Sequence, residues 1–559
     1  MAGVSVLPGT LAANPGSRMP GRLLHWIDRN ILELGREFRL SYLPPLMVYL
    51  AAGISGLTGI VGTFFVKDYL GLSAAFLASL GFWINVPWSL KMPLGHLVDL
   101  LWRYKSILVF LGAGLVATSL GIMLGLLARP DAMRQIMPLG AWFVISTLLA
   151  PVGYVVQDVV ADAMTVEAVP RVDRDGQPLP DGTIRLRHTT MQTLGRVAIV
   201  TGGIVVALLN VYLFDDVAAL NEAEKQQIYI RIYQLAFFIP LISVLGVMLG
   251  GALKLRDLRR LQRRGFELEA AWELLHGRLD KTSPNGWILG GSLLFVVFTI
   301  AMGLSELPYN QEIIFAGSML IVLFLMARLV RVLDTEARRV LVGTALIIFV
   351  YRAMPTPGPG ETWWMIDDLG FDQHFLSVLS LIGAGLALFG MFLFRRFMAE
   401  KSIAYVMVFL TIVSTLLYLP VIGMYYGLHE WTAALTSGVV DARFIALVDT
   451  ALESPLGQVA MIPMLAWIAN SAPANLKATF FAVMTSFVNL ALSLAQLGTK
   501  YLNEIFVVTR EVRDPLTGAI VVAADYRELG TLLIAATAIT FLLPILAVLL
   551  VRATPLRSA

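Results

Sequence analysis

Residues 67–77 read KDYLGLSAAFL, and residues 366–376 read IDDLGFDQHFL. An aspartate, a Leu-Gly pair and a Phe-Leu pair fall at the same places in both stretches. Three further matches follow in the same order and at nearly the same separation along the chain. They are Lys105-Ser106-Ile107 with Lys401-Ser402-Ile403, Pro151-x-Gly153 with Pro455-x-Gly457, and Arg187-His188-Thr189 with Lys477-Ala478-Thr479. Four weak matches in one order indicate that the second part of the chain repeats the first.

The composition predicts that the repeated unit is a bundle of membrane helices. Of the 559 residues, 57% are hydrophobic and only 14% are charged, and the mean hydropathy is +0.75. Apolar runs of about twenty residues, each long enough to span a bilayer, recur along the chain. We therefore expect an all-α polytopic membrane protein with about fourteen transmembrane helices. The expected spans are residues 44–66, 74–92, 105–127, 139–164, 189–212, 230–252, 286–304, 312–331, 340–366, 375–394, 402–424, 452–470, 478–500 and 529–552.

The repeat divides these spans into two halves, because the matches pair span 1 with span 9 and continue to span 5 with span 13. Spans 7 and 8 are then inserted between two six-helix halves, and we expect them to pack outside the core and to line no cavity. Two parallel six-span halves are the plan of the major facilitator superfamily fold, whose substrate site lies between the halves near the membrane midplane. The expected divisions are a cytoplasmic N-terminal segment (1–43), the first half (44–252), a linker helix (253–285), two additional helices (286–338), the second half (339–552) and a cytoplasmic tail (553–559).

The distribution of basic residues predicts the orientation. With the N-terminus inside, most of the 42 Lys and Arg fall on the inner side, which is the usual bias of cytoplasmic loops. An even number of spans puts both termini in the cytoplasm, and we expect a bacterial inner membrane. The most basic inner loop, residues 253–281, has helical spacing and is expected to be a linker helix on the membrane surface. A partner-binding helix is the alternative.

Several motifs carry a resemblance to known transporters. Residues 95–105, GHLVDLLWRYK, are similar to the signature loop of the major facilitator superfamily, with Gly95, Asp99 and Arg103 on its pattern. Most of the chain resembles the folate–biopterin transporter family, and the resemblance implies a proton-driven carrier of pteridines. The motifs that carry it are FFVKDYLGLS (64–73), VPWSLKMPLGHLVD (86–99), QDVVADAMTVE (157–167), LGR (194–196), DDLGF (367–371) and LGQVAMIPML (456–465).

Span 4 ends with two acids, Asp158 and Asp162, which share one face of a helix. Each carboxylate inside a membrane helix costs about 2.5–3.5 kcal/mol, so we expect both to be paired. Arg196 in span 5 and Lys91 at the end of span 2 lie at the same depth, and Arg196 is predicted to contact one of the acids. The matching positions of the second half carry no such charges. The four charged residues are therefore interpreted either as structural pairs, as a cytoplasmic gate or as proton-coupling groups. Glu167 is read as a loop residue.

Span 9 is predicted to be broken. It reads VLVGTALIIFVYRAMPTPGPGETWWMI (340–366), and its cluster of Pro and Gly cannot continue a regular helix. Such interruptions mark the sites of transporters. Arg352 lies at mid-membrane depth, where its planar fork suits a carboxylate or phosphate. Glu361, Trp363 and Trp364 follow the break and complete the predicted substrate site. The alternatives are an Arg352–Glu361 pair that braces the break and an interfacial belt for the tryptophans.

Two loops, residues 169–188 and 505–526, carry Asp-Gly or Thr-Gly turn signals between alternating residues and are predicted to be hairpins. The predicted function is secondary active transport of an organic anion by alternating access, coupled to protons, with folate- or pteridine-like compounds as candidate substrates. A transport-inactive relative that serves as a membrane assembly factor or scaffold is the alternative. An enzyme is not expected, because there is no Walker loop, no HExxH zinc pair and no Ser–His–Asp grouping. We expect no metal, cofactor or nucleic acid, and the sequence does not indicate the oligomeric state.

Overall fold

The structure is a computed structural model of the whole chain. It describes residues 38–558 except 70–72, 90, 102–103, 170–178, 216–219, 277–285, 304–306, 332, 395–396, 398–400, 458, 462, 465–466, 468–476 and 514–519.

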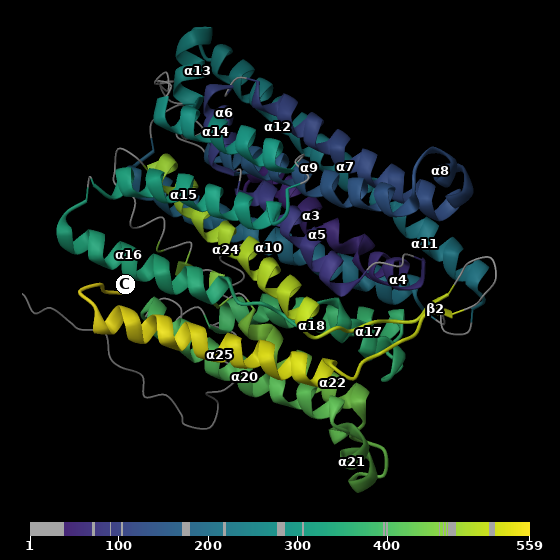
Figure 1. Cartoon of the computed structure of the whole chain (residues 1–559). Helices are drawn as coiled ribbons and strands as arrows, with labels where there is room; N and C mark the ends of the chain where they lie inside the picture. Colours follow the sequence, from purple (N-terminus) through teal and green to yellow (C-terminus); the bar gives the residue numbers. More distant parts are fainter. Residues whose placement is uncertain are drawn as a thin grey trace, which may run out of the picture.

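Nearly all of the described chain is helical (Figure 1). The elements up to the long basic helix are η2 (Leu40–Tyr42), α3 (Leu43–Ile54), η3 (Ser55–Thr58), α4 (Gly59–Tyr69), α5 (Ala74–Ser89), α6 (Lys91–Leu100), α7 (Lys105–Ala128), α8 (Pro130–Ile136), α9 (Leu139–Ala168), α10 (Asp181–Leu213), α11 (Glu222–Ala236) and α12 (Phe238–Gln262). The remaining elements are α13 (Leu268–His276), α14 (Gly286–Gly303), α15 (Asn310–Val330), α16 (Thr335–Arg352), α17 (Pro359–Asp367), α18 (Gln373–Leu393), α20 (Ile403–Tyr425), α21 (Leu428–Leu435), α22 (Ala442–Glu453), η5 (Ser454–Leu456), α24 (Lys477–Ile505), β1 (Val512–Arg513), β2 (Ile520–Val522) and α25 (Leu529–Ala553).

Within the described residues, nine helices are long and apolar enough to cross a membrane. They cover Leu40–Phe65, Lys105–Ala128, Leu139–Thr165, Thr193–Leu213, Ala223–Gln262, Asn310–Arg328, Gln373–Leu393, Ile403–Tyr425 and Leu529–Ala553. The other expected spans coincide with α5, α14, the α16–α17 pair, α24 and the partly described segment 452–470. The chain is therefore a multi-pass membrane protein, and the count of fourteen spans stays a prediction.

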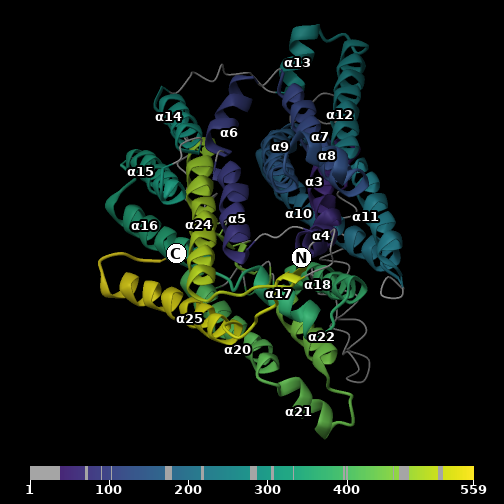
Figure 2. The ribbon, with the colours of Figure 1, turned by 45° about the vertical axis from the view of Figure 1, so that its right-hand side comes forward.

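Helices that correspond in the repeat make equivalent contacts. The second span of the first repeat, α5, packs along α24, which is the fifth span of the second repeat (Figure 2). The reciprocal pair, α10 and α18, also packs together. At the first contact Gly81 lies against the Gln496 side chain, and the Asn489 amide donates to the Trp88 carbonyl over 2.9 Å. Each repeat thus contacts the other through its second and fifth spans.

The inserted helices lie beside this contact. Helix α14 packs on α6 and α15, and α15 packs on α24, so both lie on the side of α24 that faces away from the first repeat's α10 (Figure 2). The Gln311 amide of α15 donates to Ser79 Oγ of α5 over 2.6 Å. That these helices line no cavity, and the predicted domain divisions, stay predictions.

Each repeat has an apolar core. In the first, Val61, Val116 and Ile232 join α4, α7 and α11. In the second, Ile347 and Val488 join α16 and α24, with α25 packed against them. The inserted helix α15 adds Val322 and Leu325 to the second core. The contact between the repeats carries a smaller apolar cluster, with Phe82 of α5 and Leu497 of α24, beside its polar and small residues.

The first span of each repeat departs from regular α-helix at the same place. In the first repeat, α3 and α4 are joined by the 3-10 turn η3, Ser55–Thr58. When the repeats are aligned so that Asp68 matches Asp367, this turn matches Met354–Pro357. These residues lie in the predicted break between α16 and α17. The break is therefore confirmed, and the repeat extends to it.

Helix α24 holds the broken backbone of the second repeat. The Thr356 N–H donates to Thr499 Oγ1 over 3.0 Å, and the Asn503 amide donates to the Pro357 carbonyl over 3.0 Å. Gly358 adopts φ 82°, a left-handed conformation that suits glycine, and α17 starts at the next residue. Thr540 of α25 donates to the Pro355 carbonyl over 3.5 Å, so two neighbouring helices bond to the broken backbone.

Of the two predicted hairpins, one is confirmed. Strands β1 and β2 pair antiparallel, with Val512 opposite Val522. The other prediction is wrong over 181–188, where the chain is the first part of α10, and residues 170–178 lie outside the described chain. An aspartate after Pro180 favours a helix start as well as a turn, and the long apolar run that follows extends the helix.

We expect Gly53→Ala to destabilise the protein, because an added Cβ would lie 2.1 Å from the Ile199 carbonyl oxygen of α10. Overpacking of this kind costs about 1–3 kcal/mol, so the midpoint of thermal unfolding in detergent should fall. Gly59→Ala is the matched control, since its Cβ would meet nothing within 4 Å. Equal midpoints for the two variants would show that α3 and α10 are not in close contact.

Candidate functional site

The two acids of α9 are paired mainly with Lys91. This lysine, the first residue of α6, forms an ion pair with Asp158, and its Nζ lies 3.8 Å from Asp162 Oδ2. The Tyr49 hydroxyl of α3 donates to Asp162 Oδ1 over 2.5 Å. The side chains of Lys91 and Asp158 are only 19% and 14% exposed. Lys91, Asp158, Asp162 and Tyr49, named here the charge cluster, therefore connect α3, α6 and α9.

The predicted contact of Arg196 with an acid is not formed as an ion pair. Among the described residues no carboxylate lies within 4.0 Å of its guanidinium, although Arg196 is near enough to act electrostatically on Asp162 and Lys91. The reason is Tyr49. Its ring lies 3.0 Å from where a Cβ added to Gly195 would stand, and its hydroxyl donates a hydrogen bond to Asp162 Oδ1. The tyrosine occupies the place that the sequence assigned to the arginine.

Glu167 is the residue that sequence reasoning missed. It lies in the last turn of α9 and forms ion pairs with Lys105 of α7 and Lys254 of α12. Its side chain is 7% exposed and that of Lys105 is 5% exposed. Burial alone would raise the pKa of Glu167, but the two lysines outweigh it and hold the pKa below its usual value. The sequence did contain a signal for this pairing. Lys105 begins span 3 and Lys254 follows span 6, which places both lysines at the depth of Glu167.

The signature-loop residues are described only in part. Gly95 lies in α6, and a Cβ there would meet nothing within 4 Å. Asp99 lies in the same helix. Arg103 falls outside the described residues. The role predicted for these three residues therefore stays a prediction.

Arg352 is the last residue of α16 and directly precedes the break. Its Nη1 contacts the sulfur atoms of Met461 and Met464 at 3.4 and 3.9 Å, and its Nε is buried with no hydrogen-bond partner in the described chain. Among the described residues it has no ion pair, so the alternative in which Arg352 and Glu361 brace the break is not formed. Arg352 is near enough to Arg196 for the two positive charges to repel each other.

Glu361 of α17 faces other acids. Its electrostatic neighbours are Tyr418 of α20 and Asp449 and Glu453 of α22. One oxygen of Asp449 is buried and has no hydrogen-bond partner in the described chain. No group of three or more His, Cys, Asp or Glu among the described residues stands in a geometry that could hold a metal ion.

The two tryptophans lie in the core of the second repeat. Trp363 and Trp364 are 2% and 3% exposed. The Arg510 guanidinium lies 4.8 Å from the centre of the Trp363 ring, and the Tyr425 ring lies 5.8 Å from that of Trp364. Trp364 packs with residues of α20 and α25, and Trp363 lies against Arg510, so neither ring has a contact with Arg352 among the described residues. Their assignment to the substrate site stays a prediction.

Sequence comparisons agree with this architecture. The sequence model of the BT1 family matches residues 52–557. The chain is 22% identical to the folate-biopterin transporter of Synechocystis sp. over 465 residues, which are 83% of this chain and 74% of that protein. It is 25% identical to folate transporter 2 of Plasmodium falciparum over 160 residues, which are 29% of this chain and 34% of that protein.

Solved structures show the fold. An auto-inhibited peptide transporter of the POT family aligns with a TM-score of 0.55 at 12% identity. The alignment covers 94% of this chain and 98% of the transporter chain. A POT peptide transporter in complex with sulfate aligns with a TM-score of 0.52 at 15% identity. The alignment covers 92% of this chain and 94% of that transporter chain. At these identities the likeness concerns the fold alone, which is that of the major facilitator superfamily.

We expect Lys91→Met to destabilise the protein by about 3–5 kcal/mol, because it leaves the buried Asp158 without its cation. Asp158→Asn should cost less, because Asp162 still lies 3.8 Å from Lys91. The double variant should cost less than the sum of the two, since the charges are removed together. Thermal or denaturant unfolding in detergent measures all three. Asp257→Asn, which removes a surface acid paired with Arg256, is the control and should change stability by about 1 kcal/mol or less. Additive effects would show that Lys91 and Asp158 do not interact.

The lowered pKa of Glu167 predicts a pH dependence. A carboxylate with a depressed folded pKa stabilises the folded state above its unfolded pKa of about 4.3, and this contribution is lost as the pH falls through the folded pKa. The unfolding midpoint of the wild type should therefore exceed that of Glu167→Gln at neutral pH, and the difference should shrink as the pH is lowered below about 4. A difference that does not change with pH would contradict the ion pairs.

Proposed function

We propose that this chain, which belongs to the BT1 family, is a secondary active transporter that carries an organic anion across the membrane by alternating access. The observation that carries the proposal is Arg352, at the end of a helix whose break matches the interruption of the repeat-related helix. Interrupted helices at corresponding positions of two repeats are the strongest pointer to a transporter's site. A cation at such a position costs free energy, and its role in binding an anion would explain why the chain carries it.

The chemistry of Arg352 supports a carboxylate-bearing substrate. Its partners are two thioether sulfurs, which are weak acceptors, and its buried Nε has none within the described chain. A carboxylate would replace these contacts with two parallel charge-assisted hydrogen bonds. The substrate's anionic group would therefore satisfy donors that the protein leaves with poor acceptors.

Arg196 supports a substrate with more than one negative charge. It belongs to the first repeat and Arg352 to the second, and the two repel each other without a carboxylate paired to either in the described chain. An anion between them would relieve this repulsion and would draw the two repeats together. Folate-like compounds combine a flat ring with two carboxylates, and the relatives at 22% and 25% identity are named for folate and biopterin or for folate transport. We therefore propose folate-like compounds as the substrate class.

The charge cluster is our candidate for coupling. Asp158 and Asp162 share one lysine, and Ile462 and Ala466, their counterparts in the repeat, carry no charge. A cluster needed only for folding would be expected in both repeats. We propose that protonation of the cluster, or its opening as a gate, couples transport to protons. The Lys and Arg residues gathered at the α13 end of the molecule support a cytoplasmic position for that end. We propose that the membrane is a bacterial inner membrane.

A ligand screen by thermal unfolding tests the substrate class. A compound that binds only the folded protein raises the unfolding midpoint, and above its Kd the stabilisation grows with the logarithm of its concentration. Folates and pteridines are expected to raise it, whereas nucleosides and monocarboxylates of similar size are not. Stabilisation by nucleosides alone would overturn the proposed substrate class. It would not contradict transport by alternating access, which the uptake of substrate tests separately.

We expect Arg352→Lys to weaken binding of a stabilising folate by about ten- to a hundredfold, because the loss of a charge-assisted hydrogen bond costs about 1.5–3 kcal/mol. The lysine keeps the charge but loses the planar fork. Arg338→Lys, on the exposed first turn of α16, is the control and should leave affinity unchanged. Equilibrium titration of purified protein measures both. Unchanged affinity in a folded Arg352→Lys protein would remove Arg352 from the site.

A further inference from the structure

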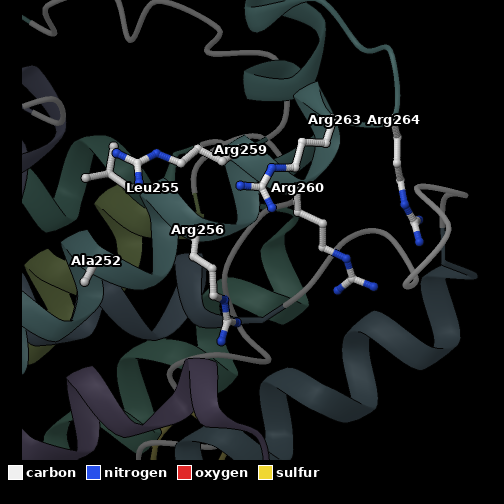
Figure 3. Close-up of a pocket in the computed structure, with 7 residues that line it drawn as sticks. All are labelled: Ala252, Leu255, Arg256, Arg259, Arg260, Arg263 and Arg264. Carbon is white, nitrogen blue, oxygen red and sulfur yellow. The ribbon is translucent and has the colours of Figure 1, made fainter.

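The last part of α12 carries a row of arginines. Arg256, Arg259, Arg260 and Arg263 recur at a spacing of three or four residues and so share one face, and Arg264 follows the helix (Figure 3). Together with Ala252 and Leu255 they line an open hollow of about 660 Å³. All five arginines are exposed. We name these five residues the arginine face.

Two members of the arginine face, Arg259 and Arg263, form no ion pair within the described part of the chain, and both are exposed. Asp257 pairs with Arg256 over 3.0 Å, and it is not one of the residues that line the hollow. The lining residues include no acid at all among those described. At Gly265, φ 93°, the chain turns, and the nearest following acids, Glu267 and Glu269, come after that turn. The face is therefore suited to an anion from outside the chain.

The position of the face points to the membrane surface. The arginines follow directly on the apolar part of the membrane-spanning helix that runs to Gln262. From Arg256 to Arg263 the helix rises about 10 Å, which is comparable with the headgroup layer beyond the hydrocarbon core. Leu255 is 55% exposed and lies within the row, and Leu268, which begins α13, is 54% exposed. Apolar side chains among arginines are typical of a helix end that contacts lipid, where the aliphatic stems lie along acyl chains.

We propose that the arginine face binds the phosphate groups of anionic phospholipids in the leaflet at the α13 end of the molecule. Guanidinium groups bind phosphate oxygens with two parallel hydrogen bonds. Basic residues immediately outside a membrane helix gain free energy from an anionic lipid surface, and the gain falls as salt screens it. The occupant is a lipid rather than a soluble phosphate compound because the hollow opens beside exposed leucines at the boundary of the apolar helix.

The test is a titration of phosphatidylglycerol into the purified full-length chain in a neutral detergent, with bound lipid counted by native mass spectrometry. Wild type is compared with Arg259→Gln/Arg263→Gln and with the matched control Arg338→Gln/Arg339→Gln, which removes two exposed arginines from the first turn of α16. All four positions are exposed, so both variants should fold, and equal unfolding midpoints without lipid check this. Each arginine lost from the face should weaken lipid binding on the order of fivefold, so the first variant should bind on the order of 25-fold more weakly.

Further arms identify the ligand and its electrostatic origin. Binding to wild type should weaken with added salt, and phosphatidylcholine should not replace phosphatidylglycerol. Soluble glycerol phosphate at equal concentration should not displace the lipid. Equal losses in the two double variants, or none in either, would overturn the proposal, and displacement by glycerol phosphate would assign the face to a soluble phosphate compound instead. Transport and folate binding play no part in these readouts, so the result stands apart from the proposed function.

Discussion

The backbone between Ala353 and Gly358 has to find its hydrogen-bond partners within the protein, because a bilayer offers none. Helix α24 supplies two of them through Thr499 and Asn503, and α25 supplies another through Thr540. Helix α24 also packs along α5 of the first repeat, so an element that stabilises the break also joins the repeats. Any movement of α24 relative to α5 would therefore act on the break and on the arginine beside it.

Buried charge is distributed unevenly between the repeats. In the first repeat the acids of α9 have lysine partners, with Lys91 on Asp158 and with Lys105 and Lys254 on Glu167. Arg196 and Arg352 differ from these, because neither has a carboxylate within ion-pair distance in the described chain. A buried ion pair with excellent geometry offsets much of the desolvation cost of its charges, whereas an arginine next to thioethers does not. The account of transport depends on this difference.

The sequence predicted those features that depend on backbone chemistry. The break after Arg352 was predictable because proline removes a donor and clashes with the preceding turn whatever surrounds it. The need to pair Asp158 followed from the cost of a charge in a membrane helix. The choice between Lys91 and Arg196 was not predictable, because it depends on how α6 and α10 are rotated and on the ring of Tyr49. Glu167 was read as a loop residue because nothing in the sequence showed that α9 continues beyond its apolar part.

Contacts between distant segments were the least predictable. The tryptophans after the break looked suited to a flat substrate, but Arg510 of the segment after α24 packs on Trp363. The hairpin predicted over 169–188 failed where its second half became the start of α10. In each case a local pattern was compatible with two structures. A segment far along the chain decided between them for Trp363, and the apolar run that follows decided for residues 181–188.

The central claim is that the chain carries a folate-like anion through a site that contains Arg352. Uptake of radiolabelled folate by proteoliposomes, with an imposed proton gradient, tests it most directly. The account predicts accumulation that a proton ionophore abolishes in the wild-type protein and that is strongly reduced in Arg352→Lys protein present at the same density. Absence of uptake in wild type under every gradient, or equal uptake by both proteins, would contradict it.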